Sequence, residues 1–270
     1  MDKQNREKVD KSNMWDLLIN FHQHCKEGYS TLPSFMPEKI EFNKVVFCGM
    51  GGSSISGDIL RVLVEKNSKV IFSVHRDYGV PSYVDEKTLL FATSYSGNTE
   101  ETISAYKEGL KRKAQAIGKE IALRGYVLLT GACPGFPLEA ARGAKQVRGT
   151  VIGISPANNY EEHRDLLHYP IEEFDFIMFP GIGKARNFLI VRSASAVVVL
   201  GGRIGTLNEF TIAYDEGKII GILRGLPGIS EYLEKIVGWA KKDTNAKIVS
   251  SADPEELISK ISALIQSELQ

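Results

Sequence analysis

Short hydrophobic runs alternate with longer amphipathic segments along most of the chain. Runs of about five apolar, β-branched residues are typical of strands buried in parallel sheets, and apolar positions three or four apart are typical of helices. We therefore expect an α/β protein whose parallel, doubly wound sheets are covered by helices on both faces. The pattern predicts strands over residues 44–48, 70–74, 88–93, 126–130, 150–154, 176–179, 196–200, 219–223 and 246–250.

The longest predicted helix follows the strand over 88–93. Asn98 is expected to cap it, with Glu101 reaching back as in a capping box. Its apolar face extends from Ile103 to Ile121, and Gly125 ends it. A second amphipathic helix is predicted over 14–27 and is ended by the proline-containing stretch 32–37. We expect an N-terminal helical segment over 1–39, a βαβαβ unit over 40–110 and a larger α/β domain over 111–270.

Composition narrows the function classes. The chain has 270 residues, with 33 Lys and Arg against 33 Asp and Glu, which argues against a basic nucleic-acid or membrane-binding face. The charged N-terminus and the lack of any long apolar run favour a cytoplasmic protein. No metal-binding spacing is present, and no cofactor is expected. The lone cysteines are expected to be reduced, buried small hydrophobes: Cys25, Cys48 and Cys133.

Two loops between a strand and a helix carry candidate anion chemistry. The first is Cys48-Gly-Met-Gly-Gly-Ser-Ser-Ile-Ser-Gly57, whose glycines let backbone N–H groups approach a ligand at a helix N-terminus. The second is Thr93-Ser-Tyr-Ser-Gly-Asn-Thr99, where hydroxyl groups precede a helix and can surround a phosphate without a fixed charge. Tight turns and ordinary helix capping are the alternatives for the two loops.

These two loops resemble the sugar isomerase (SIS) domain, and residues from about 40 to 107 look like the first half of the bifunctional phosphoglucose/phosphomannose isomerases. The resemblance implies that Ser94, Ser96 and Thr99 bind the phosphate of a sugar phosphate. It also implies that Gly51, Gly52 and Ser53 lie beside the sugar. The family places its base glutamate and ring-opening histidine in a second SIS half, and the sequence offers no such half.

A third loop, Leu200-Gly-Gly-Arg-Ile-Gly-Thr-Leu-Asn-Glu209, follows an apolar strand. It resembles the Pro-Gly-Gly-x-Gly-Thr-x-x-Glu motif of the Lonely Guy (LOG) family, which has a Rossmann-like fold and cleaves nucleoside 5′-monophosphates to base and ribose 5-phosphate. The resemblance runs from about Ala114 to Ile265. It includes the segment Thr130-Gly-Ala-Cys-Pro-Gly and Arg186 at a helix start. Two positions depart from the family pattern and leave the substrate open: Leu200 replaces its proline, and Asn187 replaces its lysine.

The LOG resemblance implies specific roles. Arg186 and Glu209 would be catalytic, with the carboxylate stabilising a cation-like sugar or activating water. The phosphate or nucleotide would be held by Gly131, Gly201, Gly202, Gly205 and Thr206. Arg186 would pair with the phosphate or with Glu209. The alternative for Glu209 is a carboxylate that complements the dipole of its helix.

The LOG-like part has no first strand of its own before the helix that contains residues 111–124. The strand over 88–93 occupies that place in the sequence, so we hypothesise that it completes the LOG-like sheet. Such a join makes the chain a composite, arising either by natural fusion or by engineering. Both families usually dimerise, so the resemblance implies a homo-oligomer, most simply a dimer.

Three functions remain open on the sequence. The first is hydrolysis of a nucleoside 5′-monophosphate, and the second is a sugar-phosphate isomerase-related role. The third is a non-catalytic sensor or carrier of a phosphorylated ligand. His163 and His168 are weaker candidates for lining a pocket, and surface or structural roles are the alternative for these side chains.

Overall fold

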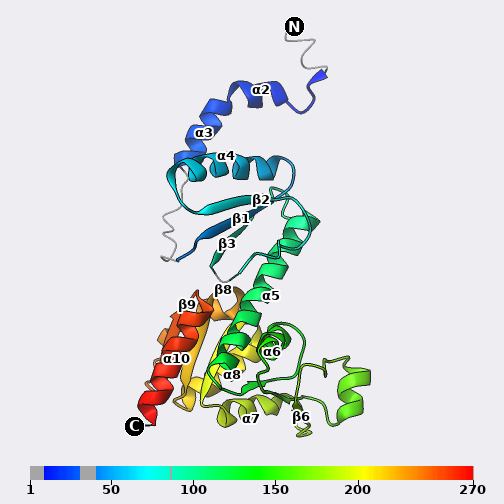
Figure 1. Ribbon diagram of the computed structural model, residues 1–270, viewed down its shortest axis with the longest axis vertical. Helices are drawn as coiled ribbons and strands as arrows, with labels where there is room; N and C mark the ends of the chain where they lie inside the picture. The colour runs from blue at the N-terminus through cyan, green and yellow to red at the C-terminus, as the bar shows by residue number, and fades with distance from the viewer. Residues whose placement is uncertain (1–8, 31–40, 86, 270) are drawn as a thin grey trace. The chain divides into compact units, whose positions relative to one another are not determined.

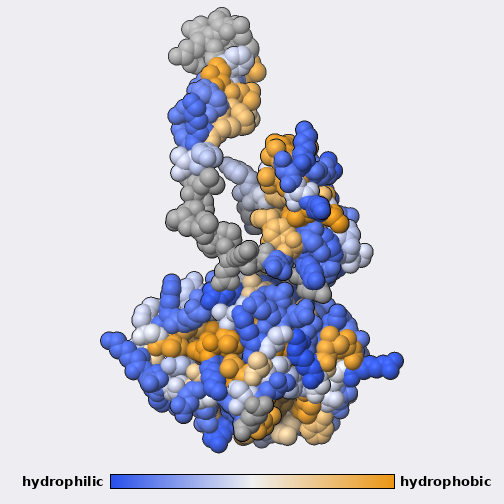
Figure 2. All heavy atoms as spheres, turned by 60° about the vertical axis from the view of Figure 1, so that its left-hand side comes forward, coloured by the Kyte–Doolittle hydropathy of each residue, from blue (hydrophilic) through white to orange (hydrophobic). Residues whose placement is uncertain are grey.

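The computed structural model describes residues 9–30, 41–85 and 87–269. Two compact units are present, Met1–Lys39 and Ile40–Gln270. In the first unit the helix predicted over 14–27 is two helices, α2 (Met14–Ile19) and α3 (Phe21–Ser30), neither of which contains a buried residue. Trp15 and Leu18, predicted to form an apolar face, are 48% and 65% exposed, and Figure 2 shows apolar side chains on the surface of this segment. The stretch over 32–37 lies outside the described residues.

The second unit contains three parallel three-stranded sheets (Figure 1), in the strand orders β2-β1-β3, β4-β5-β6 and β7-β8-β9. The alternation of strands and helices therefore confirms the α/β class with parallel sheets. The strands are β1 (Lys44–Cys48), β2 (Ile71–His75), β3 (Thr88–Ala92), β4 (Leu128–Thr130), β5 (Val151–Ile154), β6 (Phe176–Met178), β7 (Ala196–Gly202), β8 (Ile219–Gly228) and β9 (Lys247–Ser251). The α-helices between and after them are α4 (Gly52–Asn67), α5 (Glu100–Leu123), α6 (Phe136–Gln146), α7 (Arg186–Ser193), α8 (Ile204–Asp215), α9 (Leu233–Ala240) and α10 (Pro254–Glu268).

Successive side chains of the strands pack on opposite faces, and helices cover the β2-β1-β3 and β7-β8-β9 sheets on both sides. In the first sheet, Val45 and Phe47 pack with Val64 of α4, whereas Val46 and Cys48 pack with Ala105 of α5. The β7-β8-β9 sheet is sandwiched in the same way. One core cluster joins it to α5 and α10, and another joins it to α7, α8 and α9. This burial on both faces explains the near-continuous apolar runs that predicted the strands.

The strand over 88–93 does not complete the LOG-like sheet, so that hypothesis is wrong. Residues Thr88–Ala92 form β3, which pairs in parallel register with β1 in the first sheet. The element common to the two parts is instead helix α5, which extends from the first sheet to the other two (Figure 1). Its N-cap is Thr99, without a side-chain capping bond, where the sequence favoured Asn98.

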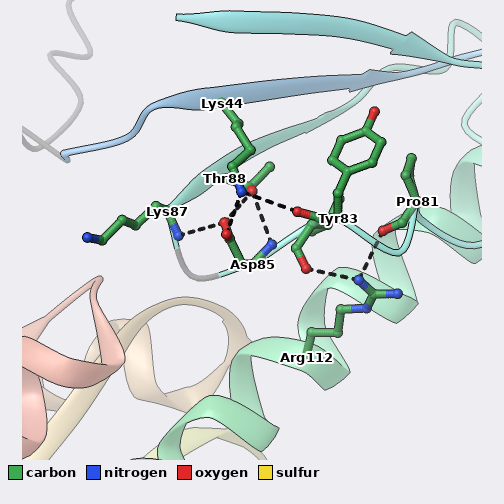
Figure 3. Close-up of polar contacts among 8 residues, drawn as sticks. Lys44, Pro81, Tyr83, Asp85, Lys87, Thr88 and Arg112 are labelled. Atoms are coloured by element: carbon green, nitrogen blue, oxygen red, sulfur yellow. Dashed lines mark hydrogen bonds and ion pairs between the residues drawn. The ribbon is translucent and has the colours of Figure 1, made fainter.

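Two adjacent residues of α5 bond to opposite parts of the unit. The Arg112 guanidinium donates to the carbonyl oxygens of Pro81 and Val84, at 3.1 and 3.0 Å, in the connection between β2 and β3. Figure 3 shows this bond to Pro81, beside the ion pair of Lys44 with Asp85. Lys113 Nζ donates to the carbonyl oxygen of Arg224 in β8, at 2.7 Å. Helix α5 is therefore tied to the first sheet and to β8 by consecutive side chains.

Close helix packing explains both glycines of α5. A Cβ at Gly109 would lie 2.5 Å from Cδ2 of Leu90 in β3. A Cβ at Gly118 would overlap the carbonyl oxygen of Ala140 in α6. The helix stays continuous through both positions because their missing side chains let β3 and α6 approach it.

Candidate functional site

The hydroxyl groups predicted to bind a sugar phosphate form one cluster at the start of α5. Ser94 Oγ lies 2.8 Å from Thr99 Oγ1 and 3.3 Å from Ser96 Oγ. Ser94 Oγ also accepts from the N–H of Gly97 at 3.0 Å. The loop therefore brings its hydroxyls together at a helix N-terminus, an arrangement that suits an anionic oxygen ligand.

The first glycine loop meets this hydroxyl cluster. Ser53 Oγ accepts from the N–H of Tyr95 at 3.2 Å. Gly51 has φ +51°, in the left-handed region, and Gly52 begins α4. Both loops follow paired strands, β1 and β3, and therefore lie at the same edge of the first sheet. The structure thus brings together six residues near the N-terminal ends of two helices, of which Ser53, Ser94 and Thr99 are half-buried and Gly51, Gly52 and Ser96 are exposed.

A second group of predicted residues lies at the carboxyl ends of β4 and β7. Arg186, the first residue of α7, is only 9% exposed. Its Nη2 lies 3.7 Å from Cys133 Sγ, whereas its buried Nε and Nη1 have no hydrogen-bond partner. A Cβ at residue 131 would overlap this guanidinium, so a side chain there would displace Arg186 from its present position. A buried arginine with two free donors is costly unless an anion or another acceptor satisfies them.

Glu209, on the first turns of α8, contributes the carboxylate of this site. Burial raises the pKa of this carboxyl, and the nearby Arg186 lowers it in part. No hydrogen bond joins Arg186 to Glu209 among the described residues. Of the two pairings expected for Arg186, with the phosphate or with Glu209, the hydrogen bond to Glu209 is not formed, and Nε and Nη1 can donate to a ligand's oxygen atoms.

The loop between β7 and α8 lies beside Arg186 and Glu209 and lines the same cavity. Gly201 and Gly202 have φ of +52° and +85°, and a Cβ at either position would overlap neighbouring atoms, among them the Thr206 side chain at Gly202. Thr206, Gly202 and Gly205 line the cavity that Arg186 and Glu209 also line. The N-terminal backbone of α8 can accept an anion there.

Two contributors to this site were not predicted. Cys133 contacts Arg186, and burial raises the pKa of its thiol, with Arg186 acting in the opposite direction. Asn187 Nδ2 donates to Asn208 Oδ1 at 2.9 Å, which joins α7 to α8 directly beside Arg186 and Glu209. The position of Cys133 directly after Gly131 could have placed it in this site. No feature of the sequence predicted the hydrogen bond between Asn187 and Asn208.

Two weaker expectations are corrected. His163 does not line the cavity, because it is buried with Nδ1 2.8 Å from Ser155 Oγ and Nε2 3.0 Å from the carbonyl oxygen of Pro170. His168, which has a positive φ of 52°, does not line it either.

Cys25 is exposed on α3 rather than buried, and Cys48 is buried as expected. None of the described helices combines the length and apolarity needed to cross a membrane.

Comparisons with known proteins divide the chain in the same way. The bifunctional phosphoglucose/phosphomannose isomerase of Caldicellulosiruptor bescii is 52% identical over 106 residues, which are 38% of this chain and 31% of that protein. The chain thus spans about a third of the isomerase's length. An uncharacterized protein of Archaeoglobus fulgidus is 35% identical over 113 residues, 42% of this chain and 70% of that one.

A solved structure supports the Rossmann-like fold. The X-ray structure of a structural-genomics target superposes with a TM-score of 0.51 and 21% identity, over 82% of this chain and 99% of that chain. At the family level, residues 40–122 match the SIS domain and residues 96–258 match the SLOG cluster4 family. The two matches overlap on α5, the helix common to both parts of the structure. The chain therefore belongs to the SLOG cluster4 family and carries a SIS domain ahead of the SLOG region.

Proposed function

We propose that the SLOG region binds a nucleoside 5′-monophosphate and hydrolyses its N-glycosidic bond. The observation that carries the proposal is the buried Arg186, whose Nε and Nη1 lack partners and which lines the same cavity as Glu209. An anionic ligand would satisfy these donors and compensate the buried charge. The N-terminus of α8, with Gly205 and Thr206, would hold the phosphate.

The chemistry assigned to Glu209 follows from its surroundings. In the hydrolysis, the C1′–N bond breaks, its electron pair and a proton pass to the base, and water adds to C1′. A carboxylate near C1′ stabilises the cation-like sugar and takes the proton of the attacking water. Burial, which raises the pKa of Glu209, favours proton exchange nearer neutral pH than an exposed carboxyl would allow.

The direct test is AMP turnover by the wild-type chain and by Glu209→Gln, with adenine and ribose 5-phosphate as products. We expect the substitution to lower turnover about 100-fold or more, the usual contribution of a general acid or base. Glu216→Gln is the matched control, because Glu216 caps the far end of α8 and pairs with Arg192. Equal turnover by Glu209→Gln and wild type would contradict the catalytic role. AMP binding without turnover by the wild type would favour the sensor or carrier alternative.

A second candidate function, sugar-phosphate binding, is supported by the hydroxyl cluster of Ser94, Ser96 and Thr99. We propose binding without isomerase chemistry, since the sequence offers no second SIS half. Thermal unfolding with AMP, glucose 6-phosphate or fructose 6-phosphate would compare the two sites. A ligand at 100 times its Kd adds about 2.7 kcal/mol to the free energy of unfolding. Stabilisation by hexose phosphates alone would favour the SIS loops as the working site.

A further inference from the structure

A cavity of about 1430 Å³ separates two sheets of the SLOG region. Strand β4 pairs only with β5, and β7 pairs only with β8, among the strands that the structure describes. The unpaired edges of β4 and β7 both line this cavity. The lining residues from these edges include Leu128, Leu129, Thr130, Ala196, Val197 and Val198.

The two edge strands run in the same direction. The loop after β4 carries Cys133, which contacts Arg186. The helix after β7 carries Glu209, which lies near enough to Arg186 to interact with its charge and lines the same cavity. Because the segments that follow both strands meet at one side chain, the carboxyl ends of β4 and β7 lie at the same end of the cavity.

The walls of the cavity are mainly apolar along the strands. Helices α5 and α10 contribute Ile117, Ile121 and Ile261, and α7 contributes Ile190 and Val191. Charged residues line it as well: Glu139 and Arg142 pair with each other at 3.0 Å, and Lys107, Lys111 and Arg203 also belong to the lining. The volume also exceeds the usual range of small-molecule pockets, about 300–1,000 Å³.

The backbone N–H and C=O groups on the unpaired strand edges determine which kind of molecule can fill the cavity. Leu128 N donates to the carbonyl oxygen of Thr150 at 3.0 Å, on the β5 side. The N–H and C=O of the next residue, Leu129, therefore point to the opposite side, toward the cavity. Apolar molecules can cover the walls, but only an extended peptide can also satisfy the backbone groups of two facing strand edges.

We propose that an extended apolar segment of a second polypeptide inserts between β4 and β7, parallel to both. One strand there would join the two three-stranded sheets into a continuous seven-stranded sheet. The segment would have about five to seven apolar, β-branched residues. The residues after it would lie beside Arg186, which lines the same cavity.

This chain's own described strands do not supply the segment. Strand β3, which precedes α5, pairs with β1, and the other strands hold places in the three sheets. A second copy of the chain has its strands engaged in the same way. Among the described residues no strand is free to fill this place, and the proposal commits to a different polypeptide with a free apolar segment. The proposal does not depend on which ligand Arg186 and Glu209 bind.

The probe is a synthetic peptide with the sequence of residues 44–53. This sequence forms a buried strand between two parallel neighbours and continues into a glycine-serine loop. We expect the peptide to bind the full chain and to slow hydrogen exchange at the amide of Leu129. In the chain alone, that amide should exchange faster than the amide of Leu128, which bonds to β5.

Two controls separate a strand from a merely apolar ligand. The same peptide N-methylated at Val46 and Cys48 keeps its side chains but loses strand donors, so its affinity should fall about tenfold or more. Leu129→Pro removes the cavity-facing N–H and should weaken binding similarly, whereas Leu129→Ala keeps that N–H and should bind. If Leu129→Pro fails to fold, the affinity of the N-methylated peptide for the wild-type chain tests the proposal instead.

Three results would overturn the proposal. They are no binding of the unmodified peptide, equal binding of the methylated one, and a slowly exchanging Leu129 amide in the chain alone. AMP hydrolysis is measured separately. Its failure would contradict the proposed function while leaving peptide binding to be judged on its own result.

Discussion

The two candidate binding regions differ in how their polar groups are satisfied before a ligand arrives. In the SIS loops, Ser94 and Thr99 hydroxyls bond to each other at 2.8 Å, and Tyr95 is fully exposed. In the SLOG region, Arg186 is 9% exposed and two of its donors have no partner. Water can replace a ligand at the first region at little cost. The second region holds a buried guanidinium with unsatisfied hydrogen-bond donors, and a ligand that accepts from them would remove that cost.

The same contrast appears in how tightly the two ends of α5 are packed. Toward the first sheet, Gly109 accommodates the side chain of Leu90, which can adjust its rotamer. Toward the SLOG sheets, Gly118 faces the backbone of Ala140, and Gly143 of α6 faces the backbone of Gln115. Backbone atoms in two packed helices cannot yield to a new side chain. The SLOG end of α5 should therefore tolerate substitution least.

The largest expected effect is from Gly118→Ala. The added methyl group would overlap the carbonyl oxygen of Ala140, so α5 and α6 must separate. We expect the free energy of unfolding, measured by urea denaturation, to fall by about 3 kcal/mol or more. Gly238→Ala in α9 is the control, because a Cβ there meets no atom within 4 Å and should raise stability by up to about 1 kcal/mol. Equal effects of the two substitutions would contradict the packing argument.

Much of this architecture could be predicted because its signals are local. Apolar runs predicted the strands, and the glycine or hydroxyl clusters directly after them were predicted to lie at helix N-termini, where the structure has them. Glu209 and Arg186 were found through motifs within single segments, and both line the cavity. A strand followed by a helix N-terminus is a short-range pattern, so the loops needed no knowledge of the rest of the fold.

The features that the sequence did not predict depend on distant partners. Strand β3 was recognised as a strand, but its neighbour is chosen by tertiary packing. That neighbour is β1, 44 residues earlier in register at Lys44 and Thr88. The contact of Cys133 with Arg186 spans 53 positions, and the bond between Asn187 and Asn208 spans 21. The N-terminal apolar face was recognised as helical, but no periodicity says whether such a face is covered.

A smaller effect is expected at the SIS loops, where one hydroxyl is removed from a cluster of three. Thr99→Val keeps the shape of the side chain, and Thr99 makes no side-chain capping bond to lose. Glucose 6-phosphate affinity, measured by calorimetry, should fall about five- to tenfold, since one hydrogen bond contributes about 1 kcal/mol. AMP binding should not change. Ser267→Ala, near the end of α10, is the control. Unchanged hexose-phosphate affinity in Thr99→Val would mean that this cluster does not hold the phosphate.

The smallest effect concerns one carboxyl group and is visible only through pH. Burial raises the pKa of Glu209 above its usual 4.5, so the folded state holds this proton more tightly than the unfolded state. Its contribution is therefore fully favourable below about pH 4.5 and is lost as pH rises through the folded pKa. Urea denaturation between pH 4 and pH 8 should show Glu209→Gln gaining stability relative to wild type as pH rises, with the smallest difference near pH 4. A difference that moves in the opposite direction would mean that Arg186 already compensates the carboxylate. The SLOG region would then store no charge penalty at Glu209, and the contrast with the SIS loops would rest on Arg186 alone.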